Sequence, residues 1–362
     1  MARNSRWGLL CAVLFTVGAL VGFALRPLAL PLIVDPTPAQ DQVFRWTFQL
    51  HGTSAHPVFP LHQQWAEDIK TISGGRLQIT IHPVNTVVPL MESLTAVTQG
   101  TLDGAIMWGP FWTGTDPSLA LSCGQTSGLT ALEHFAWLHS YGGLPLVQAA
   151  YARHNIHWLP AVPIPAEVFL WAHRPITEVA DLTGLKLRAA GYSLDVFSAL
   201  GAAATFIPGG ETPPALMKRA VDAGEFGSLA MDVAMGFHEA ARYAMVGARA
   251  PVINDDILIN MARWRELPSD LQALLTTSLL RHGVDGHSAL LRAEQEAKQI
   301  ALDHGTVFVT VSDQLVREFR ATLDRILDRI AADNPEFATL WQHMRSFRAS
   351  FRNFRTTLHP WE

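Results

Sequence analysis

The sequence predicts an α/β protein with two similar α/β domains around a central ligand cleft, followed by long C-terminal helices. Three observations lead to this prediction. The 362 residues exceed what one hydrophobic core usually serves. The spacing of apolar residues changes repeatedly between the strand period of two and the helical period. The same order of strands and helices then returns in the second half of the chain.

The first half has the pattern of a βαβαβ unit. Apolar residues alternate over 44–48 and 77–81, and 104–108 is a short apolar run, so these segments are predicted strands. Apolar residues recur at helical spacing over 61–72 and 89–97, and glycines follow both segments. Strands and helices therefore alternate, as in an open α/β sheet.

The second half repeats this order. The segments 169–172, 185–189 and 205–207 are predicted strands, and 194–200 is a predicted helix that Gly201 stops. Another helix begins at Pro213, because proline is favoured in the first turn of a helix.

The two halves also share a local sequence. Residues 101–105 read Thr-Leu-Asp-Gly-Ala, and residues 220–224 read Ala-Val-Asp-Ala-Gly. Two similar domains explain the match economically, and a coincidence of small residues is the alternative.

We expect residues 43–162 and about 250–286 to form domain I. Residues 163–249 and part of 287–332 are expected to form domain II. Residues 333–362 form the expected C-terminal helical tail.

The composition is that of a globular protein. Apolar residues make up 49% of the chain and charged residues 16%, with 11 Trp and 18 Phe. Such a composition excludes a disordered or collagen-like chain. The formal net charge of −5, without a basic segment in the mature chain, excludes a nucleic-acid-binding protein.

The first thirty residues are predicted to be a targeting segment. Arg3 and Arg6 precede an apolar run over 8–25, which is long for a signal peptide and just long enough for a membrane span. A cleaved signal peptide and an uncleaved N-terminal membrane anchor both remain open, and either predicts export. Residues 31–42 are predicted to be a linker.

Ligands of open α/β sheets bind beyond the carboxyl ends of the strands. The segments expected there are 108–112, 163–167, 188–192 and 225–227, and they combine one arginine, two glutamates and several aromatic residues. The candidate ligand-binding residues are Trp108, Phe111, Trp112, Glu167, Arg188, Glu225 and Phe226.

Several motifs resemble a known family. The run Ser73–Leu77 (SGGRL) and the run Gly184–Arg188 (GLKLR) after Asp181-Leu182 are similar to the solute-binding proteins of tripartite ATP-independent periplasmic (TRAP) transporters. Tyr141-Gly142-Gly143 and Pro208–Glu211 (PGGE) narrow the resemblance to the branch that binds 2-oxo acids. The resemblance implies a periplasmic-binding-protein-like fold, a small organic carboxylate as ligand, and delivery of that ligand to the membrane subunits of a transporter.

The resemblance implies that Arg188 binds the carboxylate of the ligand. A guanidinium group offers a carboxylate two parallel charge-assisted hydrogen bonds in a fixed plane, which a lysine does not. The alternative is that Arg188 pairs with a surface acid.

The resemblance also implies a cation that bridges to the ligand. In the 2-oxo acid branch a Gln, the Glu of a Glu-Trp pair and backbone carbonyls hold it, and here Glu167 and Glu225-Phe226 stand at these positions. Two carboxylates with one arginine would leave the empty site one unit negative, which favours Ca²⁺ or a stronger demand for Na⁺. Alternatively, Glu167 is protonated or turned away and no metal binds.

The aromatic positions differ from those of the branch. Phe111 and Trp112 stand where the branch has tyrosines, so either the ligand is more apolar or Trp112 donates its indole N–H. Ordinary core packing is the alternative for both. Phe226 in place of Trp predicts room for a bulkier or less polar group on the ligand.

The tail is predicted to be helical. Amphipathic patterns cover 288–304 and 311–332, and an apolar stripe follows over 337–354. The resemblance implies that such a tail packs on a second subunit, so we expect a homodimer. The alternative is that the stripe folds back on its own chain.

No catalytic motif stands out. His51, His56 and His62 lie close together, but their spacing does not match a His-Glu-x-x-His site. The sequence has no phosphate loop, dinucleotide fingerprint or nucleophile elbow. We therefore expect no enzyme; a periplasmic enzyme or a membrane-tethered sensor with the same cleft is the alternative.

Overall fold

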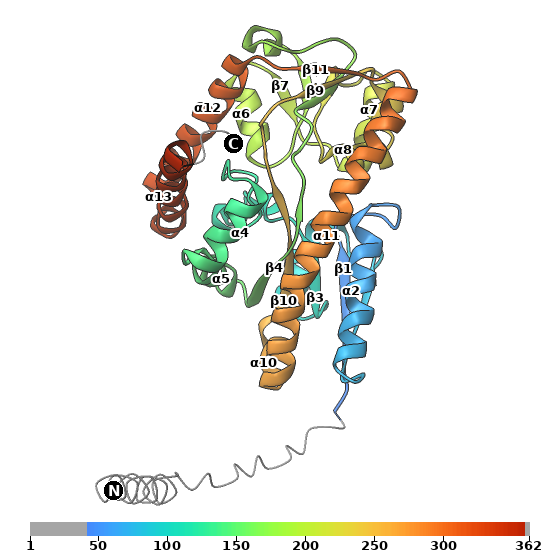
Figure 1. Cartoon of the computed structure of the whole chain (residues 1–362), viewed down its shortest axis with the longest axis vertical. Helices are drawn as coiled ribbons and strands as arrows, with labels where there is room; N and C mark the ends of the chain where they lie inside the picture. The colour runs from blue at the N-terminus through green and yellow to red at the C-terminus, as the bar shows by residue number, and fades with distance from the viewer. Residues whose placement is uncertain (1–41, 359–362) are drawn as a thin grey trace, which may run out of the picture. The chain divides into compact units, whose positions relative to one another are not determined.

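Two mixed β-sheets form the framework of the protein, which we describe from a computed structural model over residues 42–358 (Figure 1). The predicted targeting segment, nearly all of the predicted linker and the last four residues lie outside the described residues. From Val43 onward the chain forms one compact unit. We call the two sheets, with the helices packed on them, lobe I and lobe II.

Lobe I is built on a sheet with the strand order β2-β1-β3-β10-β4. β1 is parallel to β2 and β3, whereas β10 is antiparallel to β3 and β4. The strands are β1 (Phe44–Leu50), β2 (Leu77–His82), β3 (Gly104–Met107), β4 (Ile156–Ile164) and β10 (Ile253–Asn260). The helices are α2 (Val58–Ile72), α3 (Ser93–Gln99), α4 (Ala131–Ser140), α5 (Gly143–Ala152) and α10 (Met261–Glu266).

Lobe II is built on a sheet with the strand order β11-β9-β5-β8-β6-β7. The strands are β5 (Leu170–Ala172), β6 (Lys186–Arg188), β7 (Ala203–Thr205), β8 (Ala223–Gly224), β9 (Tyr243–Val246) and β11 (Val307–Thr310). The helices are α6 (Tyr192–Ala199), α7 (Thr212–Met217), α8 (Leu229–Ala234) and α9 (Phe237–Ala240). Short 3₁₀ helices lie at Leu90–Glu92, Gly109–Trp112, Pro117–Leu121, Val179–Leu182 and Gly209–Glu211.

The predicted internal repeat is real. In lobe I the unit β1-α2-β2-α3-β3 has the strand order β2-β1-β3, and in lobe II β6-α6-β7-α7-β8 has the order β7-β6-β8. The shared local sequence makes equivalent contacts: Asp103 Oδ2 accepts the N–H of Thr47 at 2.8 Å, and Asp222 Oδ2 accepts the N–H of Lys186 at 3.1 Å. The prediction of two similar α/β domains is therefore confirmed. One strand was misplaced, since β7 ends at Thr205 and does not begin there.

Several segments connect the lobes. The chain passes from β4 to β5, returns from β9 to β10, and then forms α11 (Ser269–Asp303). α11 packs on β4 and α2 in lobe I and on α8 in lobe II, and Figure 1 shows it running along both lobes. Two short crossovers and α11 thus link the lobes, and the C-terminal helices add a further link.

The C-terminal helices cover the core of their own chain. α12 (Asp313–Asp333) packs on α6 and on α13 (Pro335–Leu358), and α13 packs back on α5. Phe337, Trp341 and Met344 are almost fully buried by these contacts. The first part of the apolar stripe therefore folds back on its own chain, which was the alternative to a dimer surface, whereas Phe354 at its end is 46% exposed. The homodimer itself stays a prediction.

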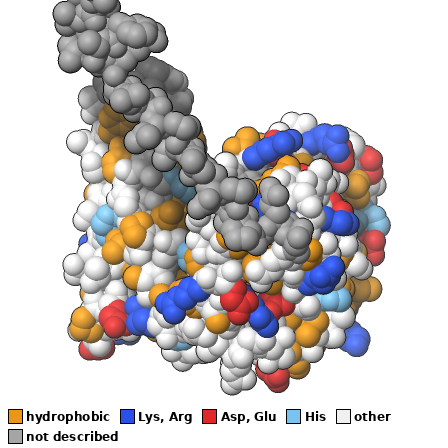
Figure 2. Space-filling view, turned by 90° about the horizontal axis from the view of Figure 1, so that it is seen from below, with side chains coloured by type: hydrophobic (Ala, Val, Ile, Leu, Met, Phe, Trp, Pro, Cys, Tyr) orange, Lys and Arg blue, Asp and Glu red, His pale blue; other side chains and the backbone are white. Residues whose placement is uncertain are grey.

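The surface is mixed in charge on the face drawn in Figure 2. Lys and Arg side chains lie among Asp and Glu side chains there, without one sign dominating that face. Within residues 42–358, no helix is both long enough and apolar enough to span a membrane.

The packing of α13 can be tested by Trp341→Ala. Trp341 is 1% exposed, and its indole N–H donates to Asp328 Oδ1 at 2.8 Å. We expect the free energy of unfolding to fall by about 3–5 kcal/mol, the usual cost of truncating a buried tryptophan. Urea denaturation measures this, with Leu132→Ala, at a residue 77% exposed, as the control that should change stability by less than about 0.5 kcal/mol. If the free energy of unfolding of the wild type instead fell on dilution, Trp341 would lie at a subunit interface.

Candidate functional site

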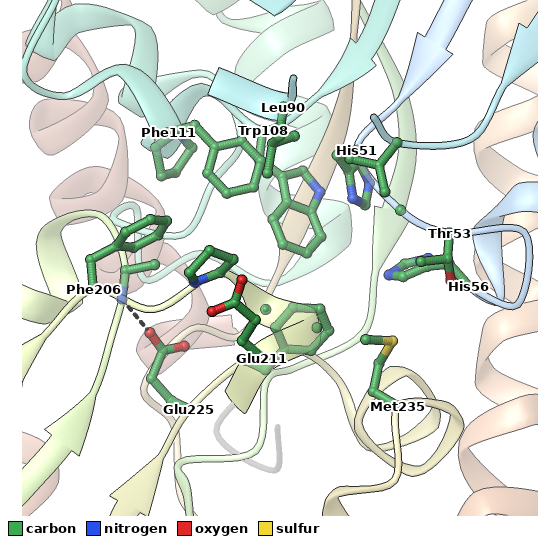
Figure 3. Close-up of a pocket in the computed structure, with 18 of the residues that line it drawn as sticks. His51, Thr53, His56, Leu90, Trp108, Phe111, Phe206, Glu211, Glu225 and Met235 are labelled. Carbon is green, nitrogen blue, oxygen red and sulfur yellow. Dashed lines mark hydrogen bonds between the residues drawn. The ribbon is translucent and has the colours of Figure 1, made fainter. Parts of the chain in front are cut away.

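A cavity of about 240 Å³ lies between the two lobes. Figure 3 shows Phe111, Trp108 and His51 along one side and Glu211 and Met235 along the other. Several of its lining residues follow the carboxyl ends of β1, β3, β6 and β8, where the loops of the two repeated units meet.

Arg188 is anchored on one side and available on the other. It is the last residue of β6 and is 3% exposed. Its Nε donates to the carbonyl oxygen of Ile207 at 2.9 Å, and its Nη1 donates to the carbonyl oxygen of Glu225. Among the described residues Nη2 finds no hydrogen-bond partner, so its two N–H groups remain for a ligand in the cavity that Arg188 lines.

Glu167 and Glu225 share a second arginine, Arg249. Arg249 Nη2 lies 2.5 Å from Glu167 Oε2 and 3.2 Å from Glu225 Oε2. Gln125 Nε2 donates to Glu167 Oε1 at 3.4 Å, and the N–H of Ala190 donates to Glu225 Oε1 at 2.7 Å. One oxygen of each carboxylate therefore accepts a hydrogen bond. The other oxygen of each lies within ion-pair distance of Arg249, and Glu167 Oε2 has no hydrogen-bond partner among the described residues.

Arg249 corrects the expected charge of the site. The expectation of one negative unit counted Arg188 alone against the two glutamates. With Arg249 in contact with both carboxylates, two positive groups face two negative ones. The argument for a preference for Ca²⁺ or a stronger demand for Na⁺ therefore fails.

Burial changes the ionisation of the acids in this region. Burial raises the pKa of Glu167 to about 8, against the attraction of Arg249, and the charge of Glu225 adds to the rise. Burial also raises the pKa of Asp232 well above its ordinary value, although its carboxylate accepts from Trp171 Nε1 and from the N–H of Gly227. Both shifts favour the neutral forms of these acids, so less negative charge of the protein lies near Arg188.

Aromatic rings form the walls of the cavity. The Trp108 ring lies 5.7 Å from Phe111 and 6.2 Å from Phe226, between ring centroids. The guanidinium carbon of Arg188 lies 5.8 Å from the Phe226 centroid and 6.0 Å from that of Phe206. The cavity therefore offers apolar faces around one cationic group.

Trp112 is the exception among the predicted site residues. Its side chain is 3% exposed, packs in the hydrophobic core and does not line the cavity. The short 3₁₀ helix Gly109–Trp112 directs Phe111 and Trp112 to different surroundings. The prediction that the Trp112 indole donates to the ligand is corrected accordingly.

His56 contributes an imidazole without a partner. It lines the cavity and is 1% exposed, and neither ring nitrogen has a hydrogen-bond partner among the described residues. A Cβ at Gly52 would lie 2.7 Å from His56 Cγ, so only glycine allows this packing. Burial lowers the pKa of His56 to about 3, and the neighbouring His51 adds to the effect. The ring is therefore neutral at pH 7, with one donor and one acceptor nitrogen.

The structure brings together six of the seven candidate residues and adds others. Those at the cavity are Trp108, Phe111, Glu167, Arg188, Glu225 and Phe226. Sequence reasoning missed Arg249, Gln125, Phe206 and the role of His56. The available signal for Arg249 was an isolated charge within the apolar segment 244–253.

Two similar lobes that enclose a cavity with a buried arginine define a two-lobed ligand-binding protein. The model of the family described as bacterial extracellular solute-binding protein, family 7 (DctP), matches residues 50–334. The chain belongs to this family, whose members are transport proteins and not enzymes. The predicted resemblance to TRAP solute-binding proteins is confirmed.

Individual relatives agree with this assignment. A monocarboxylate 2-oxoacid-binding periplasmic protein from Nostoc sp. (strain PCC 7120) is 29% identical over 305 residues, 84% of each chain. A TRAP solute-binding protein from Pseudoalteromonas atlantica, with bound sodium and pyruvate, has a TM-score of 0.82 at 25% identity and covers 88% of this chain and 97% of its own. One from Colwellia psychrerythraea, with bound calcium and pyruvate, has a TM-score of 0.83 at 24% identity, covering 88% and 98%. The last of these shows the fold alone.

Both solved neighbours were crystallised with a bound cation together with pyruvate, in agreement with the cation that the resemblance implied. In this chain, donors of the protein itself contact the two carboxylates that the resemblance assigns to the cation. The oxygens of Glu167 and Glu225 are already contacted by Arg249, Gln125 and Ala190. Among residues 42–358, no cluster of three or more His, Cys, Asp or Glu side chains is arranged to hold a metal. Arg249 already supplies a positive charge to both carboxylates, so their charge alone does not require a resident metal ion.

The raised pKa of Glu167 predicts how stability depends on pH. The folded pKa of about 8 lies above the ordinary 4.5, so unfolding releases a proton between these values and wild-type stability falls as pH rises. Glu167→Gln removes this titration. We expect the stability of the wild type relative to the variant to decrease from pH 5 to pH 8, by at most about 1.4 kcal/mol per pH unit. Urea unfolding of both ligand-free proteins at each pH measures the two stabilities. A wild type that becomes more stable relative to the variant as pH rises would contradict the prediction.

Proposed function

We propose that this chain is the extracytoplasmic binding protein of a TRAP transporter, and that it captures a small 2-oxo acid or related carboxylate. The observation that carries the proposal is Arg188, which is buried at the cavity with Nη2 unused. A carboxylate there would receive two charge-assisted hydrogen bonds from Nη1 and Nη2. The Nostoc relative supports monocarboxylate 2-oxo acids as the ligand class.

The walls of the cavity support a ligand with an apolar or aromatic group. Phe111, Trp108 and Phe226 surround the space next to Arg188. Burying an apolar group against these rings contributes about 25 cal/mol per Å² removed from water. A 2-oxo acid with an aromatic side group uses both features, the charge and the rings.

Capture involves both lobes, because each supplies part of the wall. Arg188 and Phe226 belong to lobe II, whereas Trp108, Phe111 and His56 belong to lobe I. A ligand that touches both lobes favours the arrangement in which they are close. The closed protein then presents the ligand to the membrane subunits of the transporter, outside the cytoplasmic membrane to which the apolar run 8–25 would direct or anchor the chain.

The role of Arg188 is tested by Arg188→Gln and Arg188→Lys. We expect Arg188→Gln to weaken binding of pyruvate and phenylpyruvate by about 2–5 kcal/mol, because a buried carboxylate loses its charged partner. Arg188→Lys should recover only part of this loss, since an ammonium lacks the planar fork. Titration calorimetry measures the affinity of both variants for these ligands. Arg174→Gln, at a side chain 56% exposed in the same lobe, is the control, and equal affinities for all four proteins would refute the assignment.

His56 supports a second polar contact at the far end of the ligand. Figure 3 shows it across the cavity from Phe206 and Glu225, next to Thr53. Its unpartnered ring nitrogens cost free energy while buried, and a ligand hydroxyl or carbonyl would satisfy one of them. We therefore propose that His56 distinguishes ligands by the polar group they carry opposite the carboxylate.

This selectivity is tested with phenylpyruvate and 4-hydroxyphenylpyruvate, which differ by one hydroxyl group. We expect His56→Phe to weaken binding of 4-hydroxyphenylpyruvate by roughly three- to tenfold, the value of one lost hydrogen bond. Phenylpyruvate should be affected less than about twofold, since it makes no such bond. Calorimetric titration of both ligands into both proteins gives the comparison, and parallel losses would mean that His56 only supports the wall.

A further inference from the structure

Arg249 is held as a fixed component of the site. It is 1% exposed, with Nη1 donating to Ser193 Oγ at 3.0 Å and Nη2 donating to the carbonyl oxygen of Val168 at 3.3 Å. The same Nη2 lies within ion-pair distance of Glu167 and Glu225. Contacts from several directions therefore fix the guanidinium group between the two carboxylates.

Arg249 stands behind the carboxylates and does not reach the ligand directly. Glu167 and Glu225 line the cavity, whereas Arg249 does not. It lines a separate small space with Gln125 and Ser193. Arg249 therefore acts on the ligand through the glutamates, as a positioning residue.

The charge balance leaves little attraction for a metal ion. Arg188 and Arg249 carry two positive charges against the two glutamates. Negative ligands favour a buried metal ion, because they help to replace its lost hydration, and the ligand-free group offers no net negative charge.

We propose that Arg249 is the built-in cation of this site, and that the protein binds its carboxylate ligand without a metal ion. The guanidinium group holds Glu167 and Glu225 in position, so that Glu225 in turn keeps the Ala190 N–H and Arg188 aligned at the cavity. The measurements of ligand affinity rest on the proposed function, whereas titration of the ligand-free protein with CaCl₂ does not.

The wild type gives the first test. After treatment with EDTA and transfer to a sodium-free choline buffer, we expect its affinity for pyruvate and phenylpyruvate, supplied as Tris salts, to change less than about twofold. Titration of CaCl₂ into the ligand-free wild type should give no binding heat. An affinity that falls tenfold in this buffer and returns with NaCl or CaCl₂ would overturn the proposal.

Arg249→Gln gives the second test. Removing the guanidinium group leaves two buried carboxylates without their shared cation, so we expect ligand affinity to fall by at least about tenfold. CaCl₂ should restore part of it, and CaCl₂ alone should now bind the ligand-free variant. Arg249→Lys keeps a positive charge and should remain indifferent to CaCl₂.

The control is Arg348→Gln, which removes a buried arginine paired with Asp324 at 2.6 Å in the C-terminal helices. It should lower stability without changing ligand affinity or creating calcium binding. If Arg249→Gln does not fold, the wild-type titrations still decide the matter. If no carboxylate binds any of the proteins, the proposed function fails, while CaCl₂ binding to the ligand-free wild type would separately refute the role of Arg249.

Discussion

The buried ion pairs between two arginines and two glutamates determine how this site is built. Arg188, Arg249, Glu167 and Glu225 are each at most 3% exposed. Removing an ion from water costs several kcal/mol, and only well-placed partners offset this cost. The four side chains come from the crossover before β5, the end of β6, the loop after β8 and the crossover after β9. These segments must therefore keep fixed relative positions, and the crossovers between the lobes are tied to the ligand site.

The repeated βαβαβ unit explains why the two lobes contribute different chemistry. Counting from the equivalent Asp103–Thr47 and Asp222–Lys186 pairs, Gln49 in lobe I occupies the position of Arg188. Gln49 is fully buried, and its Nε2 donates to the carbonyl oxygen of Val88 at 2.9 Å. In lobe I, Gln49 therefore binds a loop of its own lobe. In lobe II, the side chain of Arg188 is longer and charged, and the N–H groups of its Nη2 remain for a ligand in the cavity.

Sequence patterns located the site residue that a strand positions and missed those that loops position. Arg188 could be placed at the cavity because alternating residues define β6 and its end. Arg249 could not, since it follows β9 in a segment without periodicity and its partners come from distant crossovers. Trp112 was misassigned because one turn of 3₁₀ helix decides which side chain faces the cavity. The apolar stripe of α13 was identified, but periodicity does not show what covers a stripe.

Lobe I presents a rigid wall because of a buried acid that was not considered from the sequence. Asp255 Oδ1 accepts from Trp108 Nε1 at 2.7 Å and lies 3.1 Å from His51 Nε2, and Oδ2 lies 2.9 Å from His62 Nε2. Burial opposes ionisation of Asp255, but His51 and His62 hold its pKa well below the ordinary value. An ionised carboxylate thus fixes the Trp108 ring before the ligand arrives. Since lobe II is fixed in the same way by Arg249, little binding free energy is needed to order side chains, and most of it remains to hold the lobes together.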